Sequence, residues 1–188
     1  MSILDIRVLG DPILRQSTVP VQEITDELRT LVADMFETMH HARGIGLAAP
    51  QIGRTERLAV IEIEGEPLVV INPEILETSG KDKAEEGCLS IPDIYADVER
   101  PRDVVVRAMN LEGDTYEIAA TELLARCLQH EIDHLDGKLF LDYLSVLKRT
   151  AALTKWKLHQ DRYPGFVRRT ALETPEDRER HKHPEEEL

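Results

Sequence analysis

The stretch QHEIDHLDG, residues 129–137, places two histidines four residues apart, with a glutamate directly after the first. One turn of an α-helix separates residues four apart, so the imidazoles of His130 and His134 can converge on a single metal ion. Glu131 projects about 100° further around the helix, where it can reach a water on that ion rather than the ion itself. The pattern favours a catalytic metal centre over a pair of ordinary core histidines.

The residues around this stretch predict where the helix begins and ends. Thr121 is a suitable amino-terminal cap and Gly137 a suitable stop, so the helix should run from about Thr121 to about Leu135 or Asp136. Its apolar side consists of Leu124, Leu128, Ile132 and Leu135, and its polar stripe of Glu122, Gln129, Asp133 and Asp136. Both histidines lie off that stripe, on a side shared with Leu123 and Cys127, so they should point inward.

A hydrolytic metal site needs three protein ligands and an open position for water. The candidates for the third ligand are Cys88, Cys127, Asp136 and Asp142. Cys127 shares the side of His134, but a helical rise of about 10.5 Å separates them, which makes a shared ion difficult. Asp136 points around the other side, and Asp142 requires the chain to fold back after the helix. Cys88 is free to arrive from a distant loop, and the glycine before it gives the backbone room, so we favour Cys88.

Strand hairpins and a first helix are expected before the metal-binding segment. Apolar residues at helical spacing predict a helix within residues 25–44, with Thr25 as its cap. Short turn sequences join two pairs of strand-like stretches, 58–63 with 68–75 and 103–109 with 115–120. Each pair predicts an antiparallel hairpin, whereas residues 44–53, GIGLAAPQIG, are expected to be irregular. Hairpins that precede a helix favour an α+β fold with antiparallel sheets over a parallel βαβ series.

Length and composition restrict the class of protein. A chain of 188 residues fits one domain, and a hydrophobic content of 41% argues against global disorder. With 23 basic and 36 acidic residues, the net charge of −13 disfavours DNA binding through the whole surface. Two cysteines and no evident signal peptide or membrane-spanning stretch point to a soluble, cytoplasmic protein that works without contact with a membrane.

The carboxyl-terminal part of the chain is expected to be a basic helix followed by a tail. The helix should span about Ser145 to Arg162, and its cations are Lys148, Arg149, Lys155, Lys157 and Arg162. We therefore predict a single catalytic domain at residues 1–165. Residues 166–188 are charged and poor in apolar side chains, so we expect a disordered tail, in which His181 and His183 are solvated.

Three motifs resemble the signature of the peptide deformylases in their order and approximate spacing. They are GIGLAAPQ at 44–51, EGCLS at 86–90 and QHEIDHLDG at 129–137. The resemblance extends into VLGDPILRQ at 8–16 and KLFLDYLSVLK at 138–148, and it covers about residues 3–150. It implies an α+β fold in which antiparallel strands surround a central helix that carries HExxH. It also implies removal of the formyl group from the formylmethionine of nascent polypeptides, with release of formate.

The resemblance also implies roles for individual residues. It assigns one divalent ion per chain, usually Fe²⁺ with Zn²⁺, Ni²⁺ or Co²⁺ able to replace it, to the ligands Cys88, His130 and His134. Glu131 resembles the general acid and base of the family. Gln51 and the backbone N–H of Leu89 match the groups that stabilise the oxyanion.

Six residues match the substrate-binding positions of the family, Gly44, Ile45, Gly46, Leu89, Leu123 and Cys127. Gly44 and Gly46 permit close backbone approach, so we predict that an extended N-formylmethionyl peptide pairs with this stretch as an added strand. Arg126 stands at a position that is often apolar in the family, and Asp93 and Tyr95 also depart from its common residues.

Two other classes of protein carry similar features. A zinc peptidase with HExxH would take its third ligand from downstream of the helix and would make EGCLS incidental. A structural, non-catalytic metal module would close its site with four protein ligands.

Since some deformylases dock on the ribosome through a carboxyl-terminal helix, the basic last helix raises the hypothesis of a ribosomal partner.

Overall fold

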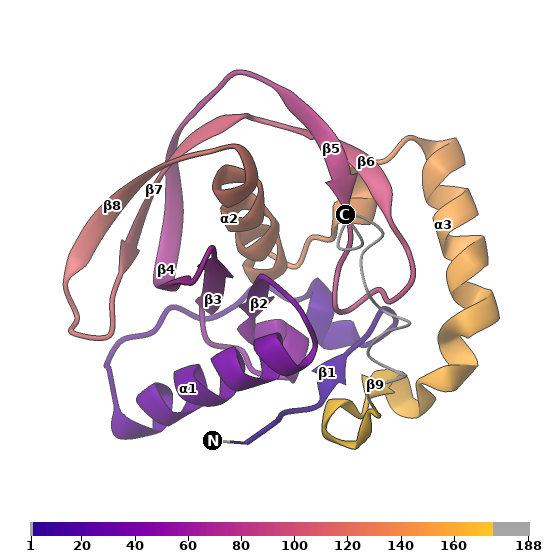
Figure 1. Ribbon diagram of the computed structural model, residues 1–188, viewed down its shortest axis with the longest axis horizontal. Helices are drawn as coiled ribbons and strands as arrows, with labels where there is room; N and C mark the ends of the chain where they lie inside the picture. Colours follow the sequence, from indigo (N-terminus) through magenta and orange to yellow (C-terminus); the bar gives the residue numbers. More distant parts are fainter. Residues whose placement is uncertain (1, 175–188) are drawn as a thin grey trace.

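Three α-helices and nine β-strands are found within residues 2–174, the part of the chain that the computed structural model describes (Figure 1). The helices are α1 (Asp26–His41), α2 (Glu122–Leu135) and α3 (Val146–His159). The strands are β1 (Ile6–Arg7), β2 (Gly46–Ala48), β3 (Leu58–Ile63), β4 (Glu66–Ser79), β5 (Asp82–Glu86), β6 (Ala96–Arg100), β7 (Asp103–Met109), β8 (Thr115–Thr121) and β9 (Val167–Arg168). None of the helices in this part is long and apolar enough to cross a membrane.

The main sheet contains five antiparallel strands in the order β2-β3-β4-β7-β8. Both predicted hairpins are confirmed, since β3 pairs with β4 from Leu58 opposite Ile71, and β7 pairs with β8 from Asp103 opposite Thr121. Register shifts interrupt the pairing of β4 with β7, and the long strands bend around α2 (Figure 1). The expected α+β class with antiparallel sheets is confirmed.

The helix α1 covers the core beside the short strands β2 and β3. Its predicted cap is present, because Thr25 Oγ1 accepts a hydrogen bond from the N–H of Leu28 at 3.1 Å. Its apolar side, which includes Val32, Met35 and Met39, is buried in a cluster with residues of β2, β3 and β4. Burial of each such side chain stabilises the fold by about 1.5–3 kcal/mol.

The helix α2 packs against the inner face of the curved sheet, and ten of its fourteen residues are buried. Leu128 and Ile132 belong to a cluster with Val104 and Val106 of β7. The helix ends where predicted, since Gly137 has a left-handed φ of 72°. A Cβ atom there would lie 2.7 Å from the carbonyl oxygen of Arg15, so only glycine fits this stop.

Strands β2, β5 and β6 lie in segments for which no strand was expected. The stretch 44–53 was expected to be irregular, but its residues 46–48 pair with β3. Strand β5 pairs with β6 from Asp82 opposite Arg100 to Glu86 opposite Ala96. The sequence DKAEE of β5 has little β-propensity, and β5 is held in place by pairing and by buried ion pairs rather than by an apolar face.

The carboxyl-terminal segment corrects part of the prediction. The helix α3 begins after the expected cap Ser145, but residues 166–172, expected to be disordered, are ordered. Strand β9 pairs with β1, and Arg168 is buried against Glu173 with Nε and Oε1 2.5 Å apart. Backbone pairing and this ion pair fix the segment despite its polar composition. Residues 175–188, with His181 and His183, lie outside the described residues.

Candidate metal centre

Cys88, His130 and His134 come together between α2 and the turn that follows β5. Their ligand atoms all lie within 4.8 Å of one another, and Cys88 Sγ is 3.2 Å from His134 Nε2. This is the predicted set of ligands, and within residues 2–174 no other group of three or more His, Cys, Asp or Glu residues could hold an ion in this way.

The other candidates for the third ligand are engaged elsewhere. Asp136 pairs with Arg57 at 2.7 Å, and Asp142 pairs with Arg15 at 2.5 Å. The Cys127 thiol is buried and lies 3.8 Å from the carbonyl oxygen of Ile45, and burial raises its pKa well above the ordinary value. No downstream carboxylate within the described residues joins the two histidines, as an HExxH peptidase would require.

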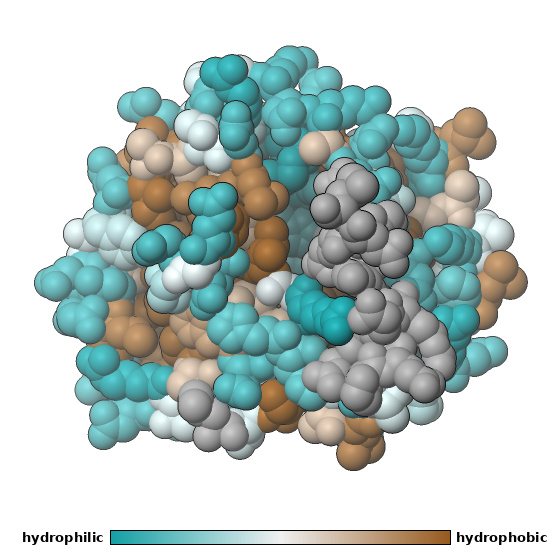
Figure 2. Space-filling model, in the orientation of Figure 1, coloured by the Kyte–Doolittle hydropathy of each residue, from teal (hydrophilic) through white to brown (hydrophobic). Residues whose placement is uncertain are grey.

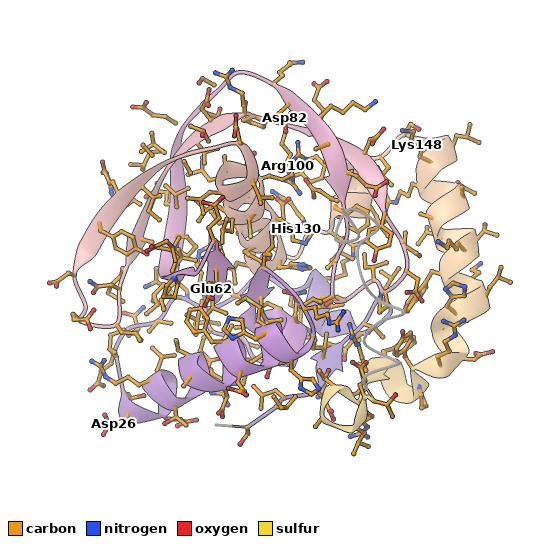
Figure 3. All side chains as sticks on the ribbon, in the orientation of Figure 1. Asp26, Glu62, Asp82, Arg100, His130 and Lys148 are labelled. Carbon is orange, nitrogen blue, oxygen red and sulfur yellow. The ribbon has the colours of Figure 1, made fainter. Side chains whose placement is uncertain are left out.

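The donor set fits a divalent ion. One thiolate and two imidazoles suit Zn²⁺ or Fe²⁺, and three protein ligands leave a fourth position for water or substrate. Burial lowers the pKa of His134 well below its ordinary value, so its imidazole is neutral and available for coordination. His130 lies near the middle of the molecule (Figure 3). Its Nδ1 is 3.0 Å from Glu86 Oε2, which leaves its Nε2 for the ion.

Electrostatics at His130 also favour a cation. Burial lowers the pKa of this imidazole, but hydrogen bonds to Cys88 and Glu86 outweigh burial and raise the pKa well above its ordinary value. Cys88 and Glu86 therefore make the surroundings of the ring favourable to positive charge, and a divalent ion would benefit from the same surroundings.

Glu131 lies inside the protein beside the amino-terminal end of β2. Its side chain is buried, and its Oε2 atom has no hydrogen-bond partner within residues 2–174. Burial raises the pKa of Glu131 to about 7, the range in which a carboxyl group can both accept and return a proton. A Cβ atom at Gly46 would overlap Glu131 Oε1, so the glycine provides the space that this carboxyl group occupies.

The side chain of Gln51 is oriented toward Cys88 and Ser90. It lies in the short 3-10 helix Ala49–Ile52, and its Oε1 accepts a hydrogen bond from the N–H of Ala48 at 2.8 Å. Its Nε2 consequently points toward Ser90 Oγ, at 3.2 Å, and Cys88 Sγ, at 3.6 Å. An amide donor with one fixed end is suited to stabilise negative charge that develops near Cys88 Sγ.

A cleft of about 360 Å³ opens beside these groups. All six predicted substrate-binding residues line it, namely Gly44, Ile45, Gly46, Leu89, Leu123 and Cys127. Figure 2 shows a recess near the middle of this face with hydrophobic surface along one side. Ile45 and Leu123 are about half exposed there, at 43% and 51%, although large apolar side chains are usually covered.

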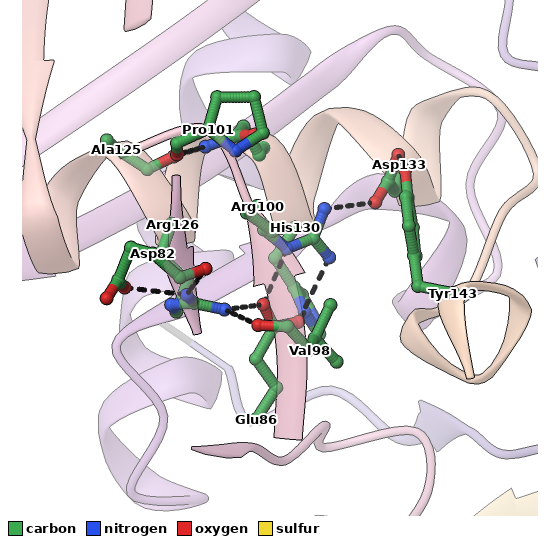
Figure 4. Close-up of polar contacts among 11 residues, drawn as sticks. Asp82, Glu86, Val98, Arg100, Pro101, Ala125, Arg126, His130, Asp133 and Tyr143 are labelled. Atoms are coloured by element: carbon green, nitrogen blue, oxygen red, sulfur yellow. Dashed lines mark hydrogen bonds and ion pairs between the residues drawn. The ribbon is translucent and has the colours of Figure 1, made fainter. Parts of the chain in front are cut away.

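A buried network of charges stands behind His130, and the sequence motifs did not reveal it. Glu86 accepts hydrogen bonds from Arg100, whose guanidinium also reaches Asp133 at 2.8 Å, and Asp133 accepts one from Tyr143 (Figure 4). Burial raises the pKa of Glu86, but hydrogen bonds from His130 and Arg100 outweigh it and hold the pKa far below its ordinary value. Only the position of Glu86 within EGCLS was a signal for this network.

Comparisons with known proteins agree on one family. The sequence model of the family described as polypeptide deformylase matches residues 3–150. The peptide deformylase of Hydrogenovibrio crunogenus is 56% identical over 160 residues, which are 84% of this chain and 95% of that protein. A crystal structure of a peptide deformylase from Legionella pneumophila has a TM-score of 0.82 and 48% identity, and it covers 85% of this chain and 96% of that one. The Synechococcus elongatus enzyme, solved in complex with actinonin, has a TM-score of 0.79 and 48% identity over 81% of this chain and 86% of that one.

Proposed function

Because this chain belongs to the polypeptide deformylase family, we propose that three of its residues, Cys88, His130 and His134, hold the catalytic ion of the family. The enzyme is a metal-dependent hydrolase that removes the N-formyl group from nascent polypeptides. The convergence of the three ligand atoms within 4.8 Å is the observation that carries the assignment. We propose one ion per chain, Fe²⁺ in the native enzyme, with Zn²⁺, Ni²⁺ or Co²⁺ able to replace it.

The residues around the ion divide the chemistry of amide hydrolysis among them. When bound, the ion supplies Lewis acidity, which polarises the formyl carbonyl and makes water a better nucleophile. Glu131 takes the proton from the attacking water and delivers it to the departing amine. The Nε2 of Gln51 and the backbone N–H of Leu89 donate to the carbonyl oxygen as its negative charge grows, which contributes about 3 kcal/mol per donor.

The substrate is an N-formylmethionyl peptide held in the cleft as an extended strand. Strand β2 lies at the edge of the five-stranded sheet, and β3 is its one partner in the described part of the chain. Its second edge is therefore the natural place for a peptide backbone to add. Leu123 and Cys127 line the cleft on the α2 side and suit the unbranched thioether side chain of methionine.

Metal analysis of a Cys88→Ser variant tests the ligand assignment. With a ligand removed, the variant should lose most of its bound metal and of its formate release from a formyl-Met peptide, whereas Cys127→Ser should keep the metal. An acetyl-Met peptide provides the control for the substrate. Full metal retention by Cys88→Ser would refute the proposed site.

We further propose that the enzyme is cytoplasmic. We also propose that α3 binds the ribosome, because it carries exposed cations that include Lys148 and Lys157. An exposed basic surface on a chain of net charge −13 is suited to phosphate groups of RNA. Pelleting with ribosomes should weaken with added salt and in the Lys148→Glu/Lys157→Glu double variant, while formate release stays unchanged. Pelleting that is indifferent to both changes would contradict this partner.

A further inference from the structure

Arg126 is a buried cation on α2, one turn before His130, and the mechanism above gives it no role. Its guanidinium makes four hydrogen bonds, to Glu86 Oε1 at 2.7 Å, Val98 O at 3.0 Å, Asp82 Oδ2 at 2.7 Å and Asp82 O at 3.1 Å (Figure 4). Only 8% of its side chain is exposed. A buried guanidinium with this many acceptors is held in one orientation.

The partners of Arg126 all belong to the β5–β6 hairpin. Asp82 and Glu86 are the two ends of β5, and Val98 lies in the middle of β6. Arg126 therefore links both strands of the hairpin to α2. A second link runs the opposite way, from Arg100 on β6 to Asp133 on α2, at 2.8 Å. Glu86 accepts from both arginines, so the two links meet at one carboxylate (Figure 4).

The placement of the hairpin on α2 decides the geometry of the metal centre. Cys88 follows the last residue of β5 by two positions, whereas both histidines project from α2. A shift of the hairpin along or away from α2 would move the thiol relative to the imidazoles. It would also move Glu86, whose Oε2 orients the ring of His130.

We infer that Arg126 is a positioning residue of the metal centre, which fixes the thiol-bearing hairpin against the histidine-bearing helix. This inference rests on the proposed ligands Cys88, His130 and His134. Arg126 also lines the cleft, but its charged end is turned to the hairpin by its four acceptors. The stem of the side chain can then cover the cleft wall without placing a free charge beside a methionine side chain.

Energetic considerations favour a positioning role over a role in stability. Buried ion pairs contribute little net stability, because the cost of removing two charges from water offsets their attraction. Their directional hydrogen bonds nevertheless specify one arrangement of the elements that they join. An apolar side chain of similar length could fill the volume of Arg126, but it could not select the register of β5 on α2.

The test compares variants of the full-length enzyme loaded with Co²⁺, whose bond to a thiolate gives a charge-transfer absorption. Arg126→Met keeps the length of the side chain but removes its charge. Arg126→Lys keeps the charge but removes the planar guanidinium with its several donors. Asp82→Asn weakens the hydrogen bond between residue 82 and Arg126. Arg107→Met is the matched control, because Arg107 is a half-exposed arginine on β7. Co²⁺ affinity is measured by competition with a chelator, alongside formate release and thermal unfolding.

We expect Arg126→Met to bind Co²⁺ about 10–100-fold more weakly and to show an altered thiolate-to-cobalt band, as is typical when partners of metal ligands are removed. Arg126→Lys should recover part of the affinity, and Asp82→Asn should lose about threefold, since one of four acceptors is weakened. Arg107→Met should match the wild type. Formate release should fall mainly through kcat, in parallel with the change in metal binding, while KM stays close to the wild-type value.

The inference would be overturned if Arg126→Lys and Asp82→Asn both kept the wild-type Co²⁺ affinity and spectrum, while Arg126→Met was either unchanged as well or unfolded. A lower melting temperature of Arg126→Met with unchanged affinity would also overturn it and leave a purely structural role. Failure of the proposed function is recognised separately. In that case the thiolate-to-cobalt band would persist in Cys88→Ser or be absent from the wild type.

Discussion

The helices α2 and α3 have the same length of fourteen residues but opposite relations to solvent. Ten residues of α2 are buried, whereas Trp156 is the only buried residue of α3. Glu131 and His134, which are proposed for catalysis and metal binding, are buried on α2, where surrounding side chains hold them in place. The outer helix carries exposed apolar and basic residues, Val146, Leu147, Lys148, Lys157 and Leu158 among them. The difference indicates that packing fixes the side chains of α2, whereas most side chains of α3 face solvent.

Charges on the two helices differ for the same reason. Arg126 and Asp133 of α2 have partners at 2.7–2.8 Å in an interior of low dielectric, where such interactions are strong and weakly screened by salt. Lys148 of α3 lies 4.0 Å from Asp97, and both side chains are about half exposed. An exposed pair of this kind contributes about 0–1 kcal/mol.

The largest expected effect is the loss of the acid and base on α2. Glu131→Gln keeps the size of the side chain but cannot accept a proton, so kcat for formate release should fall by about 10²–10⁴-fold. Bound metal, measured on the same preparation, should stay near one ion per chain. Glu122→Gln, an exposed glutamate at the start of the same helix, is the control and should keep full activity. A kcat of Glu131→Gln close to that of the wild type would refute the assigned role.

A matched pair of leucines tests the difference in packing. Leu128 on α2 is fully buried, whereas Leu147 on α3 is 81% exposed. Leu128→Ala should lower the free energy of unfolding by about 2–5 kcal/mol, because it leaves a cavity beside the sheet. Leu147→Ala should change it by less than about 0.5 kcal/mol. Chemical denaturation of the metal-loaded proteins measures both, and equal losses would mean that α3 is covered in solution.

Trp156 provides a smaller test, because it attaches α3 to the body. Its ring stacks on that of Tyr163, with centroids 5.7 Å apart and planes 8° from parallel. Trp156→Ala should destabilise α3 by about 2–3 kcal/mol, less than in a central core because a peripheral helix can relax into the space. Faster hydrogen exchange should be confined to α3 and the segment after it, with kcat unchanged. Loss of activity would instead couple α3 to the metal centre.

The sequence was informative where a pattern depends on neighbours along the chain. Helical spacing predicted the limits of α2, and the rise between Cys127 and His134 argued against that cysteine as a ligand. The structure brings Cys88 to the histidines across forty-two residues, as the motif resemblance implied.

Partners that are distant in the chain were not predictable in the same way. Glutamate and arginine usually lie on the protein surface. Three of them, Glu86, Arg100 and Arg126, are buried here because each is paired with an opposite charge. Strand β9 escaped prediction for a similar reason, since its two residues become a strand only through pairing with β1. Burial of polar groups depends on tertiary contacts, and a single sequence does not contain the distances between them.

The smallest expected effect lies at Asp142, in the turn between α2 and α3. Its carboxylate accepts the N–H of Leu139 at 2.9 Å and pairs with Arg15 and with Arg149 of α3. Burial raises the pKa of Asp142, but the hydrogen bonds from Arg15 and Leu139 outweigh it, so the pKa falls below its ordinary value of 3.8. A lowered pKa in the folded state stabilises the fold above the unfolded-state pKa, and this stabilisation is lost as the pH falls through the folded-state pKa.

Asp142→Asn should therefore lower the free energy of unfolding by about 0.5–1 kcal/mol at neutral pH, since the pairs are partly screened by solvent. The difference from the wild type should shrink as the pH falls below about 4, where the wild-type carboxylate also becomes neutral. Urea unfolding at several pH values measures the difference, with the exposed Asp161→Asn as control. A difference that stays constant from pH 7 to pH 3 would attribute the effect to the capping geometry alone. If the stability difference between Asp142→Asn and the wild type disappears at low pH, the contribution of Asp142 to the turn between α2 and α3 is electrostatic.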